Sequence, residues 1–174
     1  MVNYEKDYIW GEAQQKKIIP YLKKAFGDDL ILTLDRWSKY DATNYKINME
    51  IKSRKNSYSA YPTTLLTMNK ISDLSKKNIF IFNFVYDMNK NLSEIYAIEY
   101  DKKQFDTYEK RMFSRANQSW DEKEYVYIPI EDLTFIYKEE DQPEEPDKLL
   151  LPKRVVKKIK EPELVPQLQQ YCYV

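Results

Sequence analysis

Apolar and polar residues alternate most regularly along residues 47–54. The apolar positions are Ile47, Met49 and Ile51, and the polar positions are Asn48, Glu50, Lys52 and Arg54. A period of two predicts a β-strand with one buried face, because side chains at i and i+2 share a face. We therefore expect Glu50 and Lys52 to lie side by side, about 7 Å apart along the strand.

Two longer segments predict the rest of a sheet. Residues 78–86 are nearly all apolar, which is typical of a strand buried on both faces. The turn formers at residues 87–91 then lead to a strand at residues 93–99, which we expect to pair with the first as a hairpin. Shorter strands are expected at residues 30–34, 124–130 and 133–137.

Three segments predict helices. Residues 11–26 carry apolar side chains at i, i+3, i+4 and i+7, and Gly27 follows as the usual residue beyond a helix C-terminus. Pro20 predicts either a kink in this helix or a later start. A second helix is expected from Thr63 or Thr64 to about Lys77, and a third over residues 102–113. Such alternation of helices and strands predicts an α/β fold, a three-layer sandwich with a central mixed sheet flanked by helices.

The composition excludes several classes of function. The chain has 174 residues, enough for one domain with a core and too few for a second of similar size. It has no histidine, a single cysteine and two glycines, which excludes Ser-His triads, histidine or cysteine metal centres and glycine-rich phosphate loops. The N-terminal residues are charged and no apolar run approaches a membrane span. We therefore expect an intracellular, soluble protein without a membrane partner.

The composition changes after Lys138. An acidic, proline-containing run at residues 139–147 is followed by a basic run at residues 153–160 and an apolar end. This pattern predicts an α/β domain over residues 1–138 and an interaction tail over residues 139–174, which we expect to contact another copy of the chain or another protein. The basic run is equally suited to bind nucleic acid or to pair with the acidic run.

The candidate chemistry lies on the alternating strand and just before it. Asp41 precedes Glu50 by nine positions, and the turn formers Thr43 and Asn44 between them allow a reversal that brings the two carboxylates together. Two carboxylates beside an amine suit Mg²⁺ and a phosphodiester. On the competing interpretation, Glu50 and Lys52 form an ordinary ion pair on a solvated strand face.

The order of these residues resembles the PD-(D/E)XK nuclease superfamily. The matching residues are Glu12 in GEAQQKKIIPYL, Asp41 in KYDATN, and Glu50 with Lys52 in MEIKSR. The resemblance covers about residues 8–100, and Tyr40 stands where the family has a proline. It implies a restriction-endonuclease-like core and an endonuclease that hydrolyses phosphodiester bonds with Mg²⁺ or Mn²⁺, with DNA as the favoured substrate.

The resemblance also implies a role for each residue. Asp41 and Glu50 would bind the metal together with the backbone carbonyl of Ile51, Lys52 would position the attacking water, and Glu12 would serve as an outer or second-metal carboxylate. Three cations near the motif are candidates for nucleic-acid binding, namely Arg54, Lys55 and Lys70. Residues 1–77 support such a partner with an excess of Lys and Arg, 14 against 9 Asp and Glu. Three aromatic residues are suited either to stack on bases or to pack within loops, namely Trp37, Tyr58 and Tyr61.

Two alternatives stay open. The chain could be a binding or structural subunit that keeps the nuclease fold without cutting and is held in a larger assembly through its tail. It could also be an unrelated α/β protein in which Glu50 and Lys52 are merely exposed. The placement of Asp41 relative to Glu50 separates these interpretations, since metal ligands converge and surface residues diverge.

Overall fold

The structure is a computed structural model, and it describes residues 4–33, 35, 37–70, 74–114 and 122–141. The chain divides into a unit that ends at Asp141 and a second unit over residues 142–174. The boundary therefore lies three residues beyond the expected one at Lys138. Residues 142–174, and with them the expected role of the tail in assembly, lie outside the described residues.

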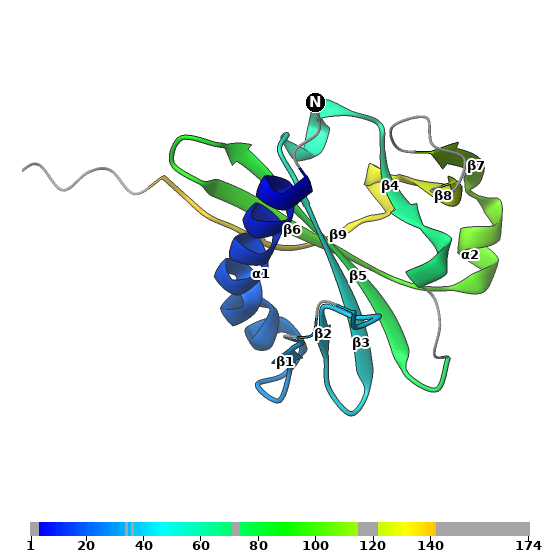
Figure 1. The fold of residues 1–174 in the computed structure, drawn as a ribbon, viewed down its shortest axis with the longest axis horizontal. Helices are drawn as coiled ribbons and strands as arrows, with labels where there is room; N and C mark the ends of the chain where they lie inside the picture. Colours follow the sequence, from blue (N-terminus) through cyan, green and yellow to red (C-terminus); the bar gives the residue numbers. More distant parts are fainter. Residues whose placement is uncertain (1–3, 34, 36, 71–73, 115–121, 142–174) are drawn as a thin grey trace, which may run out of the picture. The chain divides into compact units, whose positions relative to one another are not determined.

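The described residues form two β-sheets and two α-helices. In chain order the elements are α1 (Tyr4–Phe26), β1 (Ile31–Leu32), β2 (Ala42–Thr43), β3 (Ile47–Arg54), η1 (Tyr58–Ala60), β4 (Thr63–Thr67), η2 (Met68–Lys70), β5 (Lys77–Asp87), β6 (Leu92–Glu99), α2 (Lys102–Thr107), β7 (Glu109–Ser114), β8 (Glu122–Pro129), η5 (Ile130–Asp132) and β9 (Thr134–Lys138). The larger sheet has the order β1-β2-β3-β5-β6-β9, and the smaller one β4-β8-β7 (Figure 1).

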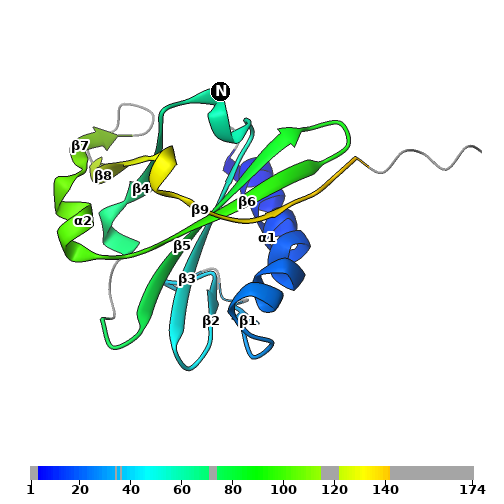
Figure 2. The ribbon, with the colours of Figure 1, turned by 180° about the vertical axis from the view of Figure 1, so that it is seen from behind.

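The larger sheet is mixed. Strands β3 and β5 are parallel, whereas the other neighbouring pairs of this sheet are antiparallel. Both views place α1 on one side of β3 and β5, and β4, β7, β8 and α2 on the other (Figure 1 and Figure 2). The predicted α/β class with a mixed sheet is confirmed, and so is the β5–β6 hairpin.

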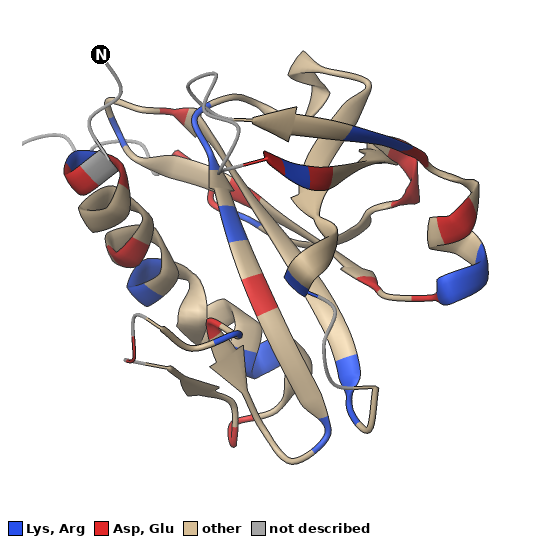
Figure 3. Cartoon of the chain, turned by 45° about the vertical axis from the view of Figure 1, so that its right-hand side comes forward, with Lys and Arg blue, Asp and Glu red and all other residues tan. Residues whose placement is uncertain are grey.

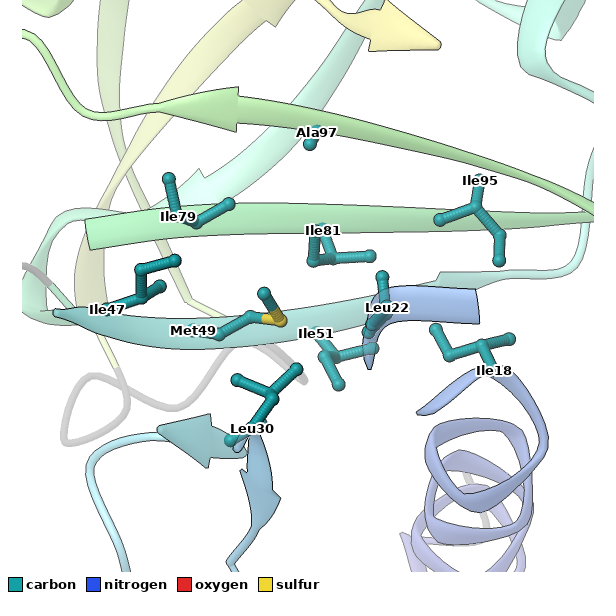
Figure 4. Packing of buried hydrophobic residues seen from close by; sticks show 11 residues of the cluster. Ile18, Leu22, Leu30, Ile47, Met49, Ile51, Ile79, Ile81, Ile95 and Ala97 are labelled. Carbon is teal, nitrogen blue, oxygen red and sulfur yellow. The ribbon is translucent and has the colours of Figure 1, made fainter. Parts of the chain in front are cut away.

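Each face of the central strands buries its own kind of side chain. Toward α1 the core is aliphatic: Ile18 and Leu22 of the helix pack against Ile47, Met49, Ile51, Ile79 and Ile81 (Figure 4). On the other face Phe80, Phe82 and Phe84 of β5 pack with Leu66, Phe105, Val126 and Ile128. Burying one such side chain fully stabilises the fold by about 1.5–3 kcal/mol. Both faces of β5 are thus buried, as its apolar run predicts.

The prediction of a second helix is wrong. Residues 63–67 form strand β4, and η2 follows over residues 68–70. Thr64 and Leu66 point into the core at alternate positions, and β4 pairs antiparallel with β8. The threonines of this segment are β-branched and favour a pleated strand over a helix, and the partner strand lies too far along the chain for local periodicity to reveal it.

The third predicted helix is too long. Asp101 caps α2 by accepting a hydrogen bond from Gln104 N at 2.8 Å, and the helix ends at Thr107. Strand β7 then begins and pairs with β8. Within α2 only Phe105 is buried, and within β7 no residue is buried, so the apolar pattern of this segment gives no indication of where the helix ends.

The first helix begins earlier than predicted and passes through Pro20. It starts at Tyr4, so the interpretation of Pro20 as a cause of a later start is wrong. Pro20 is exposed. The helix ends as expected, because Gly27 adopts φ +117° and its N–H donates to Lys23 O at 2.8 Å.

Candidate functional site

The polar face of β3 is not a solvated face. Glu50 is 2% exposed and Asn48 is 3% exposed, so the prediction of a half-buried strand is wrong. In the parallel register Glu50 lies beside Phe80 and Lys52 beside Phe82. The charged residues of β3 therefore stand at the margin of the aromatic core. Figure 3 shows that acidic and basic positions follow each other along β3, whereas the middle of β5 carries none.

Asp41 reaches this face through an irregularity at the start of β2. The N–H of Asp41 donates to Met49 O at 2.9 Å, although Ala42 is the register partner of Met49. Two consecutive residues thus face Met49, as in a β-bulge, and bulges re-aim side chains. The carboxylate of Asp41 then accepts a hydrogen bond from Ile51 N through Oδ2 at 2.7 Å. The sequence predicts this reversal from the turn formers Thr43 and Asn44, but not the bulge.

The environment of Asp41 favours its protonated form. Burial raises the pKa of this carboxyl above its ordinary value of 3.8, and the negative charge of Glu50 raises it further. The Ile51 N–H, Lys52 and Lys70 oppose the rise but do not cancel it. A carboxyl group whose pKa is raised by a neighbouring carboxylate belongs to a site whose negative charge a cation would relieve.

Two lysines hold the carboxylate of Glu50. Lys52 pairs with Oε1, and Lys70 approaches Oε2 at 3.1 Å. The Lys70 contact has the distance of an ion pair but not the geometry of a hydrogen bond, so the buried Oε2 atom makes no hydrogen bond. A buried carboxylate oxygen with an unused acceptor direction is costly for a fold. Such an atom is suited to coordinate a metal ion.

Glu12 lines the same cavity from α1. A hollow of about 680 Å³, which we call the acidic cavity, is bounded by Glu12, Asp41, Glu50, Ile51 and Lys52 together with other residues of α1 and β3. Tyr8, one helical turn before Glu12, donates its hydroxyl to Glu12 Oε1 at 2.7 Å. All four residues to which the family resemblance assigns a catalytic role therefore border one cavity.

The donor set fits Mg²⁺ with two carboxylates rather than three. Among the described residues no three acidic, histidine or cysteine side chains lie close enough to share a metal, so Glu12 does not join Asp41 and Glu50. In β3 the carbonyls of Ile47 and Met49 accept from the β2 side, and the alternation of the strand directs the Ile51 carbonyl to that edge as well. Mg²⁺ is commonly bound through one or two carboxylates, with water and phosphate as further ligands.

The three predicted nucleic-acid contacts have different surroundings. Lys55 is exposed, pairs with Asp7 at 2.8 Å and lies over the Trp10 ring, 4.8 Å from its centroid. Lys70 lies in η2 rather than on a helix of the expected length and pairs with Glu50. Arg54 donates to Leu65 O at 2.6 Å and pairs with no carboxylate among the described residues. Burial lowers the pKa of its guanidinium.

The three aromatic candidates also differ. Tyr58 is a packing residue, because its ring stacks on Tyr96 with centroids 4.0 Å apart and its hydroxyl donates to Ile130 O at 2.7 Å. Tyr61 is 64% exposed and Trp37 is 86% exposed. Tyr58 and Tyr61 border one cavity.

Sequence reasoning missed two features of the site. It places Lys70 within reach of the motif as a phosphate contact, but it does not predict that Lys70 pairs with Glu50. It also missed Tyr125 and Tyr127, which border a second cavity. The alternation in EKEYVYIP, residues 122–129, was the available indication that these tyrosines share one strand face.

Comparison with protein-family models, with curated proteins and with solved structures gives no match for this chain. Among the described residues no helix has the length and apolar character needed to cross a membrane.

Proposed function

We propose that the chain is a metal-dependent nuclease that hydrolyses phosphodiester bonds, with DNA as the favoured substrate and Mg²⁺ or Mn²⁺ as cofactor. The observation that carries the proposal is the state of Glu50. This carboxylate is buried, has an oxygen without a hydrogen bond, and lies beside Lys52 and an Asp41 whose pKa is raised. An exposed ion pair on a surface strand would also join Glu50 to Lys52, but its carboxylate would be solvated rather than buried.

Each residue then has a defined task. Asp41, Glu50 and the Ile51 carbonyl would hold the metal, which supplies acidification of a bound water and stabilisation of charge on the phosphoryl oxygens. Lys52 is placed to orient the attacking water and to balance negative charge as it develops. Glu12 borders the cavity from α1 and is placed to act on water at its outer side.

The fold supports a restriction-endonuclease-like core in part. The chain order of helix α1, the β2–β3 hairpin that carries Asp41 and Glu50, and parallel strand β5 agrees with the resemblance. The connection from β3 to β5 departs from expectation, because the described part of it contains β4 and η2 where a helix was expected.

A cleavage assay on the full chain tests the proposal. Plasmid, linear duplex and branched DNA are incubated with Mg²⁺ or Mn²⁺, and parallel samples contain EDTA. The matched control is Asp41→Asn, which keeps an acceptor for Ile51 N but removes the charge of one metal ligand. Cleavage by wild type that stops with EDTA and in the variant supports the proposal. Equal cleavage by the variant, or none under either ion, contradicts it.

One observation favours a non-catalytic subunit with the same fold. Lys52 and Lys70 place an ammonium group near each oxygen of Glu50, so the two lysines could neutralise the carboxylate permanently in place of a metal. The variant Lys70→Ala discriminates between the two functions. If Lys70 only occupies the cation position, Mg²⁺ will raise the melting temperature of Lys70→Ala and leave wild type unchanged. In the nuclease Mg²⁺ stabilises both proteins.

A further inference from the structure

A second cavity of about 680 Å³ lies next to the acidic cavity. Residues of β3, η1, β4, η2 and β8 border it, and we call it the aromatic cavity because tyrosine and phenylalanine form much of its wall. Lys52, Arg54 and Lys70 border both cavities. The two cavities therefore share a border formed by three cations.

The smaller sheet places the aromatic wall. Val126 and Ile128 of β8 point into the core, so Tyr125 and Tyr127 point to the opposite face by the alternation of the strand. Phe113 of β7 packs edge-on against Tyr125, with ring centroids 5.9 Å apart. Tyr61, which is 64% exposed, borders the same cavity. Aromatic side chains on a sheet face are platforms on which unpaired bases stack.

Arg54 supplies a positive charge at the border that this cavity shares with the acidic cavity. It is only partly accessible, and a hydrogen bond to the carbonyl of Leu65 fixes its guanidinium across β3 and β4. No described carboxylate pairs with it, and a guanidinium stays charged even when burial lowers its pKa. A positioned cation with remaining donors is suited to bind phosphate through two hydrogen bonds.

We propose that the aromatic cavity binds one unpaired nucleotide of a single-stranded nucleic acid, with the base on the tyrosine wall and the phosphate at Arg54. The volume lies within the range of pockets that enclose small ligands. The inference rests on the proposed function in one respect, since the neighbouring phosphodiester of the same strand would then lie at Asp41 and Glu50. An intact duplex cannot present a base in this way without first extruding it.

Binding without metal tests this inference separately from cleavage. The full chain is titrated in EDTA into a short fluorescein-labelled single strand, the same sequence as a duplex, and a free nucleoside monophosphate. Two variants probe the cavity, Tyr61→Ala for the wall and Arg54→Gln for the cation. Their matched controls are Tyr45→Ala and Lys90→Gln. Tyr45 is 71% exposed, Lys90 pairs with Asp141, and neither Tyr45 nor Lys90 borders either of the two cavities.

Binding of the single strand should exceed binding of the duplex, and Tyr61→Ala should weaken it about fivefold or more, as loss of one stacked base does. Arg54→Gln should weaken it and reduce its dependence on salt concentration, whereas the controls should bind as wild type does. Equal affinity for single strand and duplex would overturn the inference, and so would unchanged binding by both cavity variants. Equal affinity for the free nucleotide and the strand would overturn the assignment to a strand.

Circular dichroism of each variant shows whether it folds, and Tyr61 is exposed enough that its removal leaves the core intact. Single-strand binding without cleavage in Mg²⁺ would support this inference and contradict the proposed nuclease. Cleavage by a chain whose binding does not depend on Tyr61 or Arg54 would contradict this inference and support the proposed nuclease.

Discussion

Glu50 combines a negative charge with almost complete burial, and Lys52 provides one of its two ion-pair partners. In the proposed nuclease, Lys52→Ala removes the amine that orients water, and cleavage should slow about 10²–10⁴-fold. Asp41→Ala should be at least as damaging. Single-turnover cleavage at saturating Mg²⁺ measures both effects, and an unchanged rate in Lys52→Ala would show that the site is assigned wrongly.

The same substitution should also affect stability. A solvated β3 face predicts little change for Lys52→Ala, but the structure predicts a loss of about 1–3 kcal/mol in the free energy of unfolding, because a buried carboxylate loses a partner. Lys52→Arg is the control, since it keeps a positive group beside Glu50. Urea denaturation of the three proteins compares them.

The raised pKa of Asp41 predicts a stability that depends on pH. The folded state binds the Asp41 proton more tightly than the unfolded state, so this carboxyl destabilises the metal-free fold above its folded pKa. Asp41→Asn should therefore melt at a higher temperature than wild type at neutral pH. The advantage should vanish as pH falls through the raised pKa toward 3.8, the ordinary value. Thermal scans of both proteins in EDTA, from neutral pH to below pH 3.8, measure how the difference in melting temperature changes. At neutral pH, Mg²⁺ should make wild type the more stable of the two proteins.

At the scale of elements, local patterns predicted those strands and helices whose partners or caps lie nearby. The β5–β6 hairpin and the end of α1 at Gly27 are examples. Strand β4 was not predictable in this way, because its partner β8 lies far along the chain, as in the pair Thr67 and Tyr125. The aromatic core on the second face of β5 has the same origin, since Val126 and Ile128 of the smaller sheet are positioned by that distant pairing.

One glycine lies within α1 and the other just beyond its end, so the same substitution can be compared at both positions. Gly11 lies within the helix, and a Cβ added there would meet nothing within 4 Å, whereas Gly27 has φ +117° and a Cβ there would meet Asp29 Oδ1 at 2.7 Å. Gly11→Ala should stabilise the protein by about 0.5–1 kcal/mol, and Gly27→Ala should destabilise it by about 1 kcal/mol or more. Urea denaturation measures the change in the free energy of unfolding for each variant. If both substitutions change it in the same direction, the assigned end of the helix is contradicted.

At the scale of the whole molecule, residues just beyond β9 belong to the folded unit. Glu139 accepts hydrogen bonds from Lys17 Nζ at 2.6 Å and Ser93 N at 2.9 Å, and Asp141 pairs with Lys90. The sequence predicts a folded core that ends at Lys138, because composition shows where a charged run begins and not which of its residues bind back.

Truncation tests this boundary. A chain that ends at Asp141 should keep the stability of the α/β unit, whereas one that ends at Lys138 should lose about 1–3 kcal/mol, because Lys17 loses its carboxylate partner and the Ser93 N–H loses its acceptor. Thermal melting of both truncated chains compares them directly. If the shorter chain is as stable as the longer one, the Glu139 contacts contribute nothing to the fold.

The parallel pairing of β3 with β5 has a consequence for the order of folding. Hairpin β5–β6 closes through a short turn. Strand β3 can pair with β5 only after the intervening crossover has closed, and β4 can pair only once β8 has reached it. Closing such long segments is slow, so the rate-limiting transition state should contain the hairpin and leave the carboxylate site unformed. Substitutions at Glu50 and Lys52 should then accelerate unfolding and hardly change the refolding rate, which stopped-flow chevron plots resolve.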